Sequence, residues 1–327
     1  MSTSSKEMRY VNAVTQALAD AMAQDTSVIV MGEDVAHAGG SFKATRGLLE
    51  QFGEERVIDT PISESSITSA AVGAALTGLK PVVEIMFMDF ITLSMDALVN
   101  QAAKARYMFG GQGSVSMVLR TPHGGGLSAG PQHSQCLEAW LAHIPGLKVV
   151  CPSNPQDAYS LLRAAIADPD PVMFIEHKAM YAQKGQVDTG QSARIGEARI
   201  ARAGRDVTLV SYGATVGVCL QAAEALAAEG VEAEVIDLRS IQPWDQAAVL
   251  ESLSRTHRAV VVHEAVQAFG VGAEIVATIA DAGFDELDAP VLRVAAPFMP
   301  APFASSLEKG YVVTAERVKE AVRKTLA

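Results

Sequence analysis

Short apolar runs alternate with helical patterns from the beginning of the chain. Runs of this kind, rich in Val, Ile and Leu and bounded by polar turns, indicate strands buried on both faces. They lie at 27–31, 82–87, 116–119, 148–151 and 172–175. The clearest helix start is Asn154, a residue type that favours the N-cap, followed by Pro155 at the first helical position. Apolar residues then recur at the spacing of one helix face, from Ala158 to Ile166.

The pattern weakens into a polar stretch near residue 185 and then resumes. We interpret 186–204 as a linker between an N-terminal domain, 1–185, and a C-terminal domain, 205–327. The C-terminal domain has predicted strands at 207–211, 233–238 and 259–263, an Ala-rich helix after Thr215 and a closing helix at 315–326. Alternating strands and helices predict mainly parallel sheets covered by helices. The fold class is therefore α/β with two parallel-sheet domains, which agrees with a length of 327 residues.

Charge and targeting signals narrow the classes of function. A formal net charge of -11 argues against nucleic acid and anionic membranes as partners, because phosphate neutralisation needs clustered Lys and Arg. The polar N-terminus lacks an apolar signal core, and no run of about eighteen apolar residues could span a bilayer. The three cysteines are too scattered for a disulfide framework or a zinc site. We expect a cytoplasmic protein.

Two carboxyl-rich segments depart from ordinary strand or turn sequence. Glu64 ends the segment DTPISE and precedes a helical pattern, and ligands of open α/β sheets bind at such strand-to-helix junctions. A purely structural alternative is that Glu64 complements the dipole of that helix. Glu84 and Asp89 stand within an apolar run and therefore need polar partners. Phe90, at the end of that run, could present its ring to a heteroaromatic ligand or pack in the core.

A third segment, 121–135, contains four glycines and two histidines between a strand and a helix. Glycine permits close backbone approach, and a plain turn needs fewer of them, so a ligand-facing loop is as reasonable as a spacer. His133 is the stronger candidate for proton chemistry near neutral pH, and His123 reads more simply as a solvated loop residue. The chain has no phosphate-binding loop, dinucleotide fingerprint, nucleophile elbow or zinc-protease helix, which argues against independent hydrolytic or nicotinamide chemistry.

Six segments together resemble the beta subunits of 2-oxo acid and acetoin dehydrogenase complexes. They are GEDV (32–35), DTPISE (59–64), PVVEIMF (81–87), QHSQ (132–135), PGLKVV (145–150) and FGVGAE (269–274). Their order matches the family along nearly the whole chain. The segments 106–111 and 175–178 look most like acetoin dehydrogenase, with pyruvate dehydrogenase next.

The resemblance implies a pyrimidine-binding N-terminal domain and a transketolase-like C-terminal domain in an α2β2 heterotetramer. It implies cleavage of a carbon–carbon bond next to the carbonyl of a small oxo substrate, with transfer of the acyl unit to the lipoyl domain of an acyltransferase core. Thiamine diphosphate is expected at the alpha–beta interface. The family holds its magnesium and diphosphate with a Gly-Asp-Gly…Asn motif, and no Gly-Asp-Gly occurs here. The alpha subunit is therefore expected to supply that half of the site.

Residue roles follow from the same resemblance. Glu64 matches the glutamate that shares a proton with a ring nitrogen of the aminopyrimidine and thereby activates the cofactor. Phe90 matches the aromatic residue that packs on that ring, and Ile62 a neighbour in the same pocket. Met86 stands where some relatives carry an amide, which leaves its polar contact in doubt. His133 matches the histidine near the thiazolium, where it assists proton movement or orients the lipoyl group.

Two alternatives remain open. The turn after Ala165 and Ile166, with Asp168 and Asp170, resembles the family's potassium site, and it also fits an ordinary helix-ending turn. As a whole, the chain could instead be a noncatalytic scaffold that docks a multienzyme core through its C-terminal domain, or the beta subunit of a branched-chain 2-oxo acid dehydrogenase. A pure scaffold has no need for the Glu64, Phe90 and His133 set.

Overall fold

The computed structural model describes residues 5–327, which divide into two units. Of the described residues, the first contains 5–123 and Trp140–Ile195, and the second contains Gly124–Ala139 and Gly196–Ala327. Each unit is an α/β domain with a mostly parallel sheet, so the predicted fold class is confirmed. The second unit also takes in 124–139, a segment that the apolar pattern assigned to the N-terminal domain.

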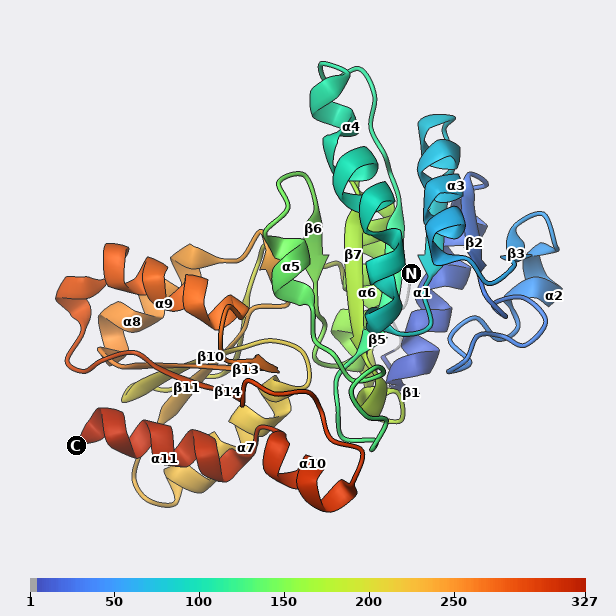
Figure 1. Cartoon of the computed structure of the whole chain (residues 1–327). Helices are drawn as coiled ribbons and strands as arrows, with labels where there is room; N and C mark the ends of the chain where they lie inside the picture. The colour runs from blue at the N-terminus through green and yellow to red at the C-terminus, as the bar shows by residue number, and fades with distance from the viewer. Residues whose placement is uncertain (1–4) are drawn as a thin grey trace. The chain divides into compact units, whose positions relative to one another are not determined.

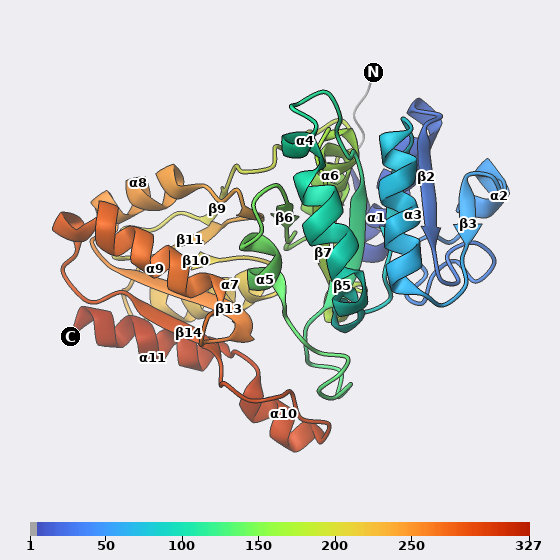
Figure 2. The ribbon, with the colours of Figure 1, turned by 45° about the horizontal axis from the view of Figure 1, so that its top comes forward.

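The sheet of the first unit has the strand order β6-β7-β5-β4-β2-β3, with all of these strands parallel. Helix α3 stands in front of this sheet in Figure 2, while α1 lies behind it and packs against α6. A separate antiparallel pair joins β1 to β8. The strands are β1 (Lys6–Arg9), β2 (Val28–Gly32), β3 (Val57–Asp59), β4 (Lys80–Glu84), β5 (Val118–His123), β6 (Lys148–Val150), β7 (Val172–His177) and β8 (Lys184–Val187).

Helices in this part of the chain include one π-helical and two 3-10 segments. They are α1 (Tyr10–Gln24), α2 (Leu48–Phe52), α3 (Glu64–Leu76), η1 (Met88–Ser94), η2 (Ala97–Ala102), α4 (Ala103–Met108), α5 (Glu138–Ala142), α6 (Pro155–Ala167) and η3 (Lys178–Met180). The predicted start of α6 is confirmed, since Asn154 Oδ1 accepts a hydrogen bond from the Asp157 N–H at 2.9 Å. This cap satisfies one of the otherwise unpaired N–H groups of the first turn.

The second unit has a five-stranded sheet in the order β14-β13-β10-β11-β9. Helices α8 and α9 lie over one face, and α7 and α11 lie over the other (Figure 1). Its elements are β9 (Arg199–Arg202), β10 (Val207–Ser211), α7 (Thr215–Ala227), β11 (Ala233–Asp237), β12 (Ser240–Gln242), α8 (Gln246–Thr256), β13 (Ala259–Val266), α9 (Val271–Ala282), η4 (Phe284–Glu286), β14 (Leu292–Ala296), α10 (Ser305–Tyr311) and α11 (Ala315–Leu326).

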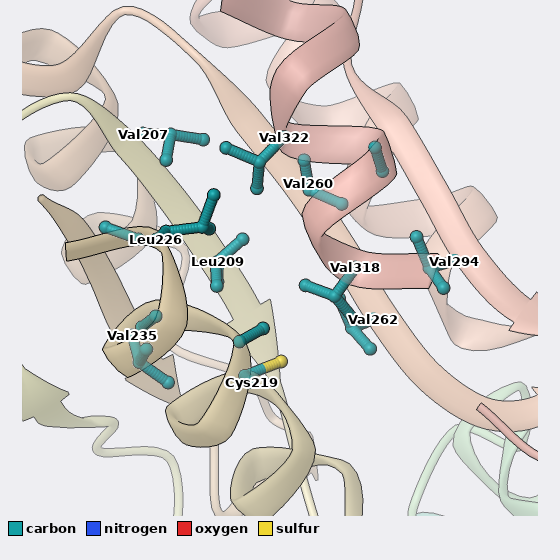
Figure 3. Packing of buried hydrophobic residues seen from close by; sticks show 14 of the residues in the cluster. Val207, Leu209, Cys219, Leu226, Val235, Val260, Val262, Val294, Val318 and Val322 are labelled. Carbon is teal, nitrogen blue, oxygen red and sulfur yellow. The ribbon is translucent and has the colours of Figure 1, made fainter. Parts of the chain in front are cut away.

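The core of the second unit explains why α7 and α11 form where they do. Figure 3 shows Cys219 and Leu226 of α7 and Val318 and Val322 of α11 pointing toward the strand residues beneath them. All four are fully buried. Each pair is separated by four or seven positions, the spacing that places apolar side chains on one helix face. Burial of these side chains stabilises the sheet and both helices together.

Three elements differ from their sequence predictions. The strand predicted at 82–87 ends at Glu84, because the carboxylate there is held by a buried ion pair and the chain then turns into η1. Strand β5 continues to His123, into the segment expected to be a loop. The segment 186–204, interpreted as a linker, contains β9, whose terminal arginines interrupt the apolar pattern of an edge strand. Within residues 5–327, no helix has both the length and the apolar character needed to cross a membrane.

Candidate functional site

The carboxyl ends of β2, β3 and β4 lie together at one edge of the first unit's sheet. Gly32 is in register with Asp59 on one side and with Glu84 on the other. Asp59 also ties the segment after β2 to β3, because its Oδ1 accepts a hydrogen bond from the Ala36 N–H at 2.6 Å. Functional groups of parallel sheets gather at this edge, since every strand delivers its following loop there.

Glu64 is the first residue of α3 and is 8% exposed. Buried hydroxyls hold the backbone of this helix start. Ser94 Oγ donates to the Glu64 carbonyl at 2.9 Å, and Thr68 Oγ1 donates to Ser94 Oγ at 2.8 Å. Ser94 is the last residue of η1, so this contact joins the segment after β4 to the first turn of α3. A carboxylate in the first turn also complements the helix dipole, which is the structural role that the sequence analysis raised.

Glu33, directly after β2, is a candidate site residue that the sequence analysis did not single out. Its side chain is 8% exposed, and its Oε1 has no hydrogen-bond partner among the described residues. Burial, and then the neighbouring Glu64 and Asp34 carboxylates, raise the pKa of Glu33 above its usual range. An acid immediately after a buried strand was the available signal. Two buried carboxyl groups thus lie close together, and one retains an unused acceptor atom.

The apolar candidate residues differ in how far their side chains are exposed to solvent. Ile62 is 83% exposed, whereas Met86 and Phe90 are half-buried. The Phe90 ring packs edge-on against Phe87, with centroids 5.8 Å apart, and Phe87 packs in the same manner against Phe42 at 5.7 Å. This aromatic cluster supports the Phe90 ring from one side. An exposed Ile62 before the buried Glu64 is an apolar side chain available to a ligand.

A buried charge cluster joins the ends of β4 and β7 through Arg120 in the middle of β5, which lies between them in the sheet. Arg120 Nη1 donates to Glu84 at 2.8 Å, and its Nε and Nη2 donate to the two Glu176 oxygens at 2.7 and 2.9 Å. Burial opposes the charge on Arg120, but Glu176 and Glu84 outweigh it and raise the pKa of the guanidinium. Tyr181 completes the cluster by donating to Glu176 at 2.8 Å. The partner expected for the buried Glu84 is therefore present.

The glycine-rich segment contributes His133, which lies in the second unit, whereas Glu64, Met86 and Phe90 lie in the first. His133 is half-buried, and its N–H donates to the Gly130 carbonyl at 3.3 Å. His123, expected to be solvated, is instead 2% exposed at the end of β5. Its ring packs edge-on against His177, the neighbouring position on β7, with centroids 5.3 Å apart. Strand pairing buries His123, which local sequence does not reveal.

The turn proposed for potassium ends α6. The Asp168 N–H donates to the Ala165 carbonyl at 3.2 Å, which is an ordinary helix end. Lys148 Nζ lies 2.7 Å from both Asp168 carboxylate oxygens, and Arg106 forms an ion pair with Asp170. Both acids thus have cationic side chains beside them. A potassium ion at the carbonyls of Ala165 and Ile166 stays a prediction.

Two family models together match most of the chain. The transketolase pyrimidine binding domain matches residues 6–184, and the transketolase C-terminal domain matches residues 196–318. A solved structure described as a split gene transketolase, inactive beta4 tetramer, has the same fold, with a TM-score of 0.82 over 98% of both chains and 21% sequence identity.

Curated relatives of known activity are similar over almost their full length. The chain is 44% identical to the pyruvate dehydrogenase E1 component subunit beta-2 of Oryza sativa subsp. japonica, over 99% of this chain and 87% of the relative. It is 43% identical to the 2-oxoisovalerate dehydrogenase subunit beta of Bacillus subtilis, over 97% of this chain and 98% of the relative. Identity to the acetoin:2,6-dichlorophenolindophenol oxidoreductase subunit beta of Bacillus subtilis is 45%, over 94% of each.

Proposed function

Because this chain belongs to the transketolase-like beta subunits of pyruvate, acetoin and branched-chain 2-oxo acid dehydrogenases, we propose that it forms half of a thiamine diphosphate site completed by an alpha subunit. The reaction is cleavage of a carbon–carbon bond next to a carbonyl, followed by transfer of the acyl unit to a lipoyl group on an acyltransferase core. The assembly is an α2β2 heterotetramer. Acetoin and pyruvate are the first substrates to test, and branched 2-oxo acids are the alternative.

The observation that carries this proposal is the buried pair of Glu64 and Glu33. The aminopyrimidine of thiamine diphosphate offers a ring nitrogen and an amino group, and a buried carboxyl group with a neighbouring unused acceptor suits both. Within residues 5–327, Glu33 Oε1 has no hydrogen-bond partner, and Ser94 holds the backbone of Glu64 in place. The half-buried Phe90 and the exposed Ile62 supply apolar surface for the ring. The residues present therefore fit the cofactor's pyrimidine end.

When bound, thiamine diphosphate would supply the chemistry that cleaves the carbon–carbon bond next to the substrate carbonyl, and residues of this chain would hold its pyrimidine end. Glu64 would hold a proton at the pyrimidine ring nitrogen and would in this way help to activate the cofactor. Phe90 and Ile62 orient the ring, with Met86 beside them. His133 moves a proton or orients the acyl acceptor.

The diphosphate and its magnesium ion belong to the alpha subunit in this proposal. The chain contains no Gly-Asp-Gly segment, and its glycine-rich loop donates backbone N–H groups to the protein's own carboxylates. A noncatalytic scaffold would gain nothing from Glu33, because a buried acceptor without a partner costs stability. The buried acids thus favour the enzyme over the scaffold.

The decisive test is Glu64→Gln in the tetramer reconstituted with an alpha subunit, thiamine diphosphate and magnesium. We expect the rate of thiazolium proton exchange to fall by at least about a hundredfold, as loss of general acid–base help would cause. Sedimentation should show that the variant assembles into the tetramer as the wild type does. Glu54→Gln, an exposed acid on the same unit, is the matched control and should exchange at the wild-type rate. Wild-type exchange in the Glu64 variant, or full turnover by the lone chain, would refute the proposal.

A further inference from the structure

The loop that carries His133 has an unusual backbone. Gly124, Gly126 and Gly130 have φ values of +90°, +87° and +78°, and Ser128 has φ of +53°. These lie in the left-handed region, which residues other than glycine enter at a cost. Left-handed residues that alternate with others can turn several backbone N–H groups toward one side and so create a concave site for an anion. In this loop the anions are side chains of the same unit.

Two carboxylates fill that concave site. Glu308 of α10 accepts from the Gly126 N–H at 2.8 Å through Oε1 and from the Ser128 N–H at 2.9 Å through Oε2. The Ser128 hydroxyl also donates to Oε2, at 3.1 Å, which makes three hydrogen bonds from this loop to the Glu308 carboxylate. Glu264 of β13 accepts from the Gly125 N–H at 2.7 Å. Glu308 is 4% exposed, so its charge is withdrawn from water and depends on these donors.

The same loop is fixed at its far end. The ring of Phe303 lies against Gly130, where a Cβ atom would meet ring carbons at 2.3 Å. Glycine suits this position both because of its left-handed φ and because the ring leaves no room for a Cβ atom unless Phe303 shifts. The Gly130 carbonyl in turn accepts the His133 N–H at 3.3 Å. Only Ala129 separates Ser128, which bonds to Glu308, from Gly130, which accepts from His133, so both contacts lie on one short stretch of backbone.

We propose that Glu308, assisted by Glu264, is a positioning residue for His133. The inference rests on the proposed function only in taking His133 as the group that serves acyl transfer. Glu308 touches neither substrate nor cofactor in this account. It fixes the path of the loop, and the loop fixes where the imidazole points. Reacting groups must be held close to one geometry, and a displacement of about 1 Å can cost roughly a hundredfold in rate.

The informative substitution is Glu308→Gln, which keeps the size of the side chain. The amide oxygen can still accept from Gly126, but the amide nitrogen then faces the Ser128 N–H, and two donors repel. We expect reductive acylation of a lipoyl domain by the reconstituted tetramer to fall roughly 10- to 100-fold. Thiazolium proton exchange, assigned to Glu64, should stay at the wild-type rate. Glu308→Asp keeps both acceptor oxygens and should recover part of the loss.

Two further variants show how large the effect of Glu308→Gln is by comparison. Ser128→Ala removes only the hydroxyl contact and should have a smaller effect than Glu308→Gln. Glu224→Gln alters an exposed acid on α7, in the same unit, and should change nothing. If Glu308→Gln does not assemble, Glu264→Gln tests the same idea through Gly125, with the same selective loss expected.

A double substitution separates positioning from general damage. If Glu308 acts through His133, adding Glu308→Gln to His133→Ala should reduce acyl transfer by less than twofold, because groups that act as a unit are not additive. Additive losses, or equal losses of acyl transfer and proton exchange, would overturn the inference and leave the proposed function standing. Wild-type acyl transfer in His133→Ala alone would instead remove the role proposed for His133.

Discussion

Arg120 donates to Glu84 at 2.8 Å at the point where β4 ends and the segment carrying Met86 and Phe90 begins. Gly40 lies against the same carboxylate, since a Cβ there would come within 3.0 Å of Glu84 Oε1. The segment that carries the half-buried Phe90 thus begins directly after a buried ion pair. This relationship, and the buried acids beside it, lead to three predictions about the chain.

We expect Arg120→Met to lower the free energy of unfolding by about 3–5 kcal/mol, because it leaves Glu84 and Glu176 buried without their cation. Urea unfolding of the isolated chain measures this. Arg205→Met, at a largely exposed arginine whose pair with Asp206 spans 3.9 Å, is the control and should change stability by less than about 1 kcal/mol. A loss of that small size at Arg120 would mean that the cluster does not hold the strand ends.

Glu33→Gln should raise the melting temperature at pH 7 while lowering activity. The pKa of Glu33 is raised in the folded chain, chiefly by burial. At pH values between the pKa of Glu33 in the unfolded chain and its pKa in the folded chain, the native state binds more protons than the unfolded state does. Stability therefore falls as pH rises through that window. Above the folded pKa the ionised carboxylate costs stability, and an uncharged amide removes that cost.

Thermal unfolding of wild type and Glu33→Gln from pH 4 to pH 8 tests this directly. The two curves should converge at the acidic end, where the wild-type carboxyl is protonated, and separate toward neutral pH. Glu54→Gln should follow the wild type throughout. A lower melting temperature for Glu33→Gln at pH 7 would contradict a raised pKa and would weaken the view of this residue as a functional acid.

Phe90→Ala should weaken thiamine diphosphate binding to the reconstituted tetramer by up to about tenfold, the usual worth of an aromatic contact. The dissociation constant is measured by titrating the tetramer with the cofactor and following the quenching of protein fluorescence. Phe284→Ala, at an exposed ring of the second unit, serves as the control and should bind as the wild type does. Unchanged affinity in Phe90→Ala would show that this ring belongs to the core cluster with Phe87 alone.

Much of the fold was predictable because its signals are local. The apolar runs that became β2, β6, β7, β10, β11 and β13 were identified within a few residues of their ends. The Asn154 cap and the limits of α11 were identified as predicted. Glu64, Met86, Phe90 and His133 were named from motifs alone, and their roles stay predictions. The resemblance behind them is confirmed, because relatives of three activities align over nearly the whole chain.

The amino-acid sequence by itself determined the alternation of strands and helices, the family and the identity of the candidate groups, because periodicity and motifs are properties of neighbouring residues. Only the tertiary structure decided that Glu33 is a buried acid with an unused oxygen and that Arg120 holds Glu84 and Glu176. It also decided that Glu308 anchors a loop about 180 positions earlier in the chain. Such contacts depend on the path of the folded chain, and burial and hydrogen bonding between distant residues leave no local pattern to read.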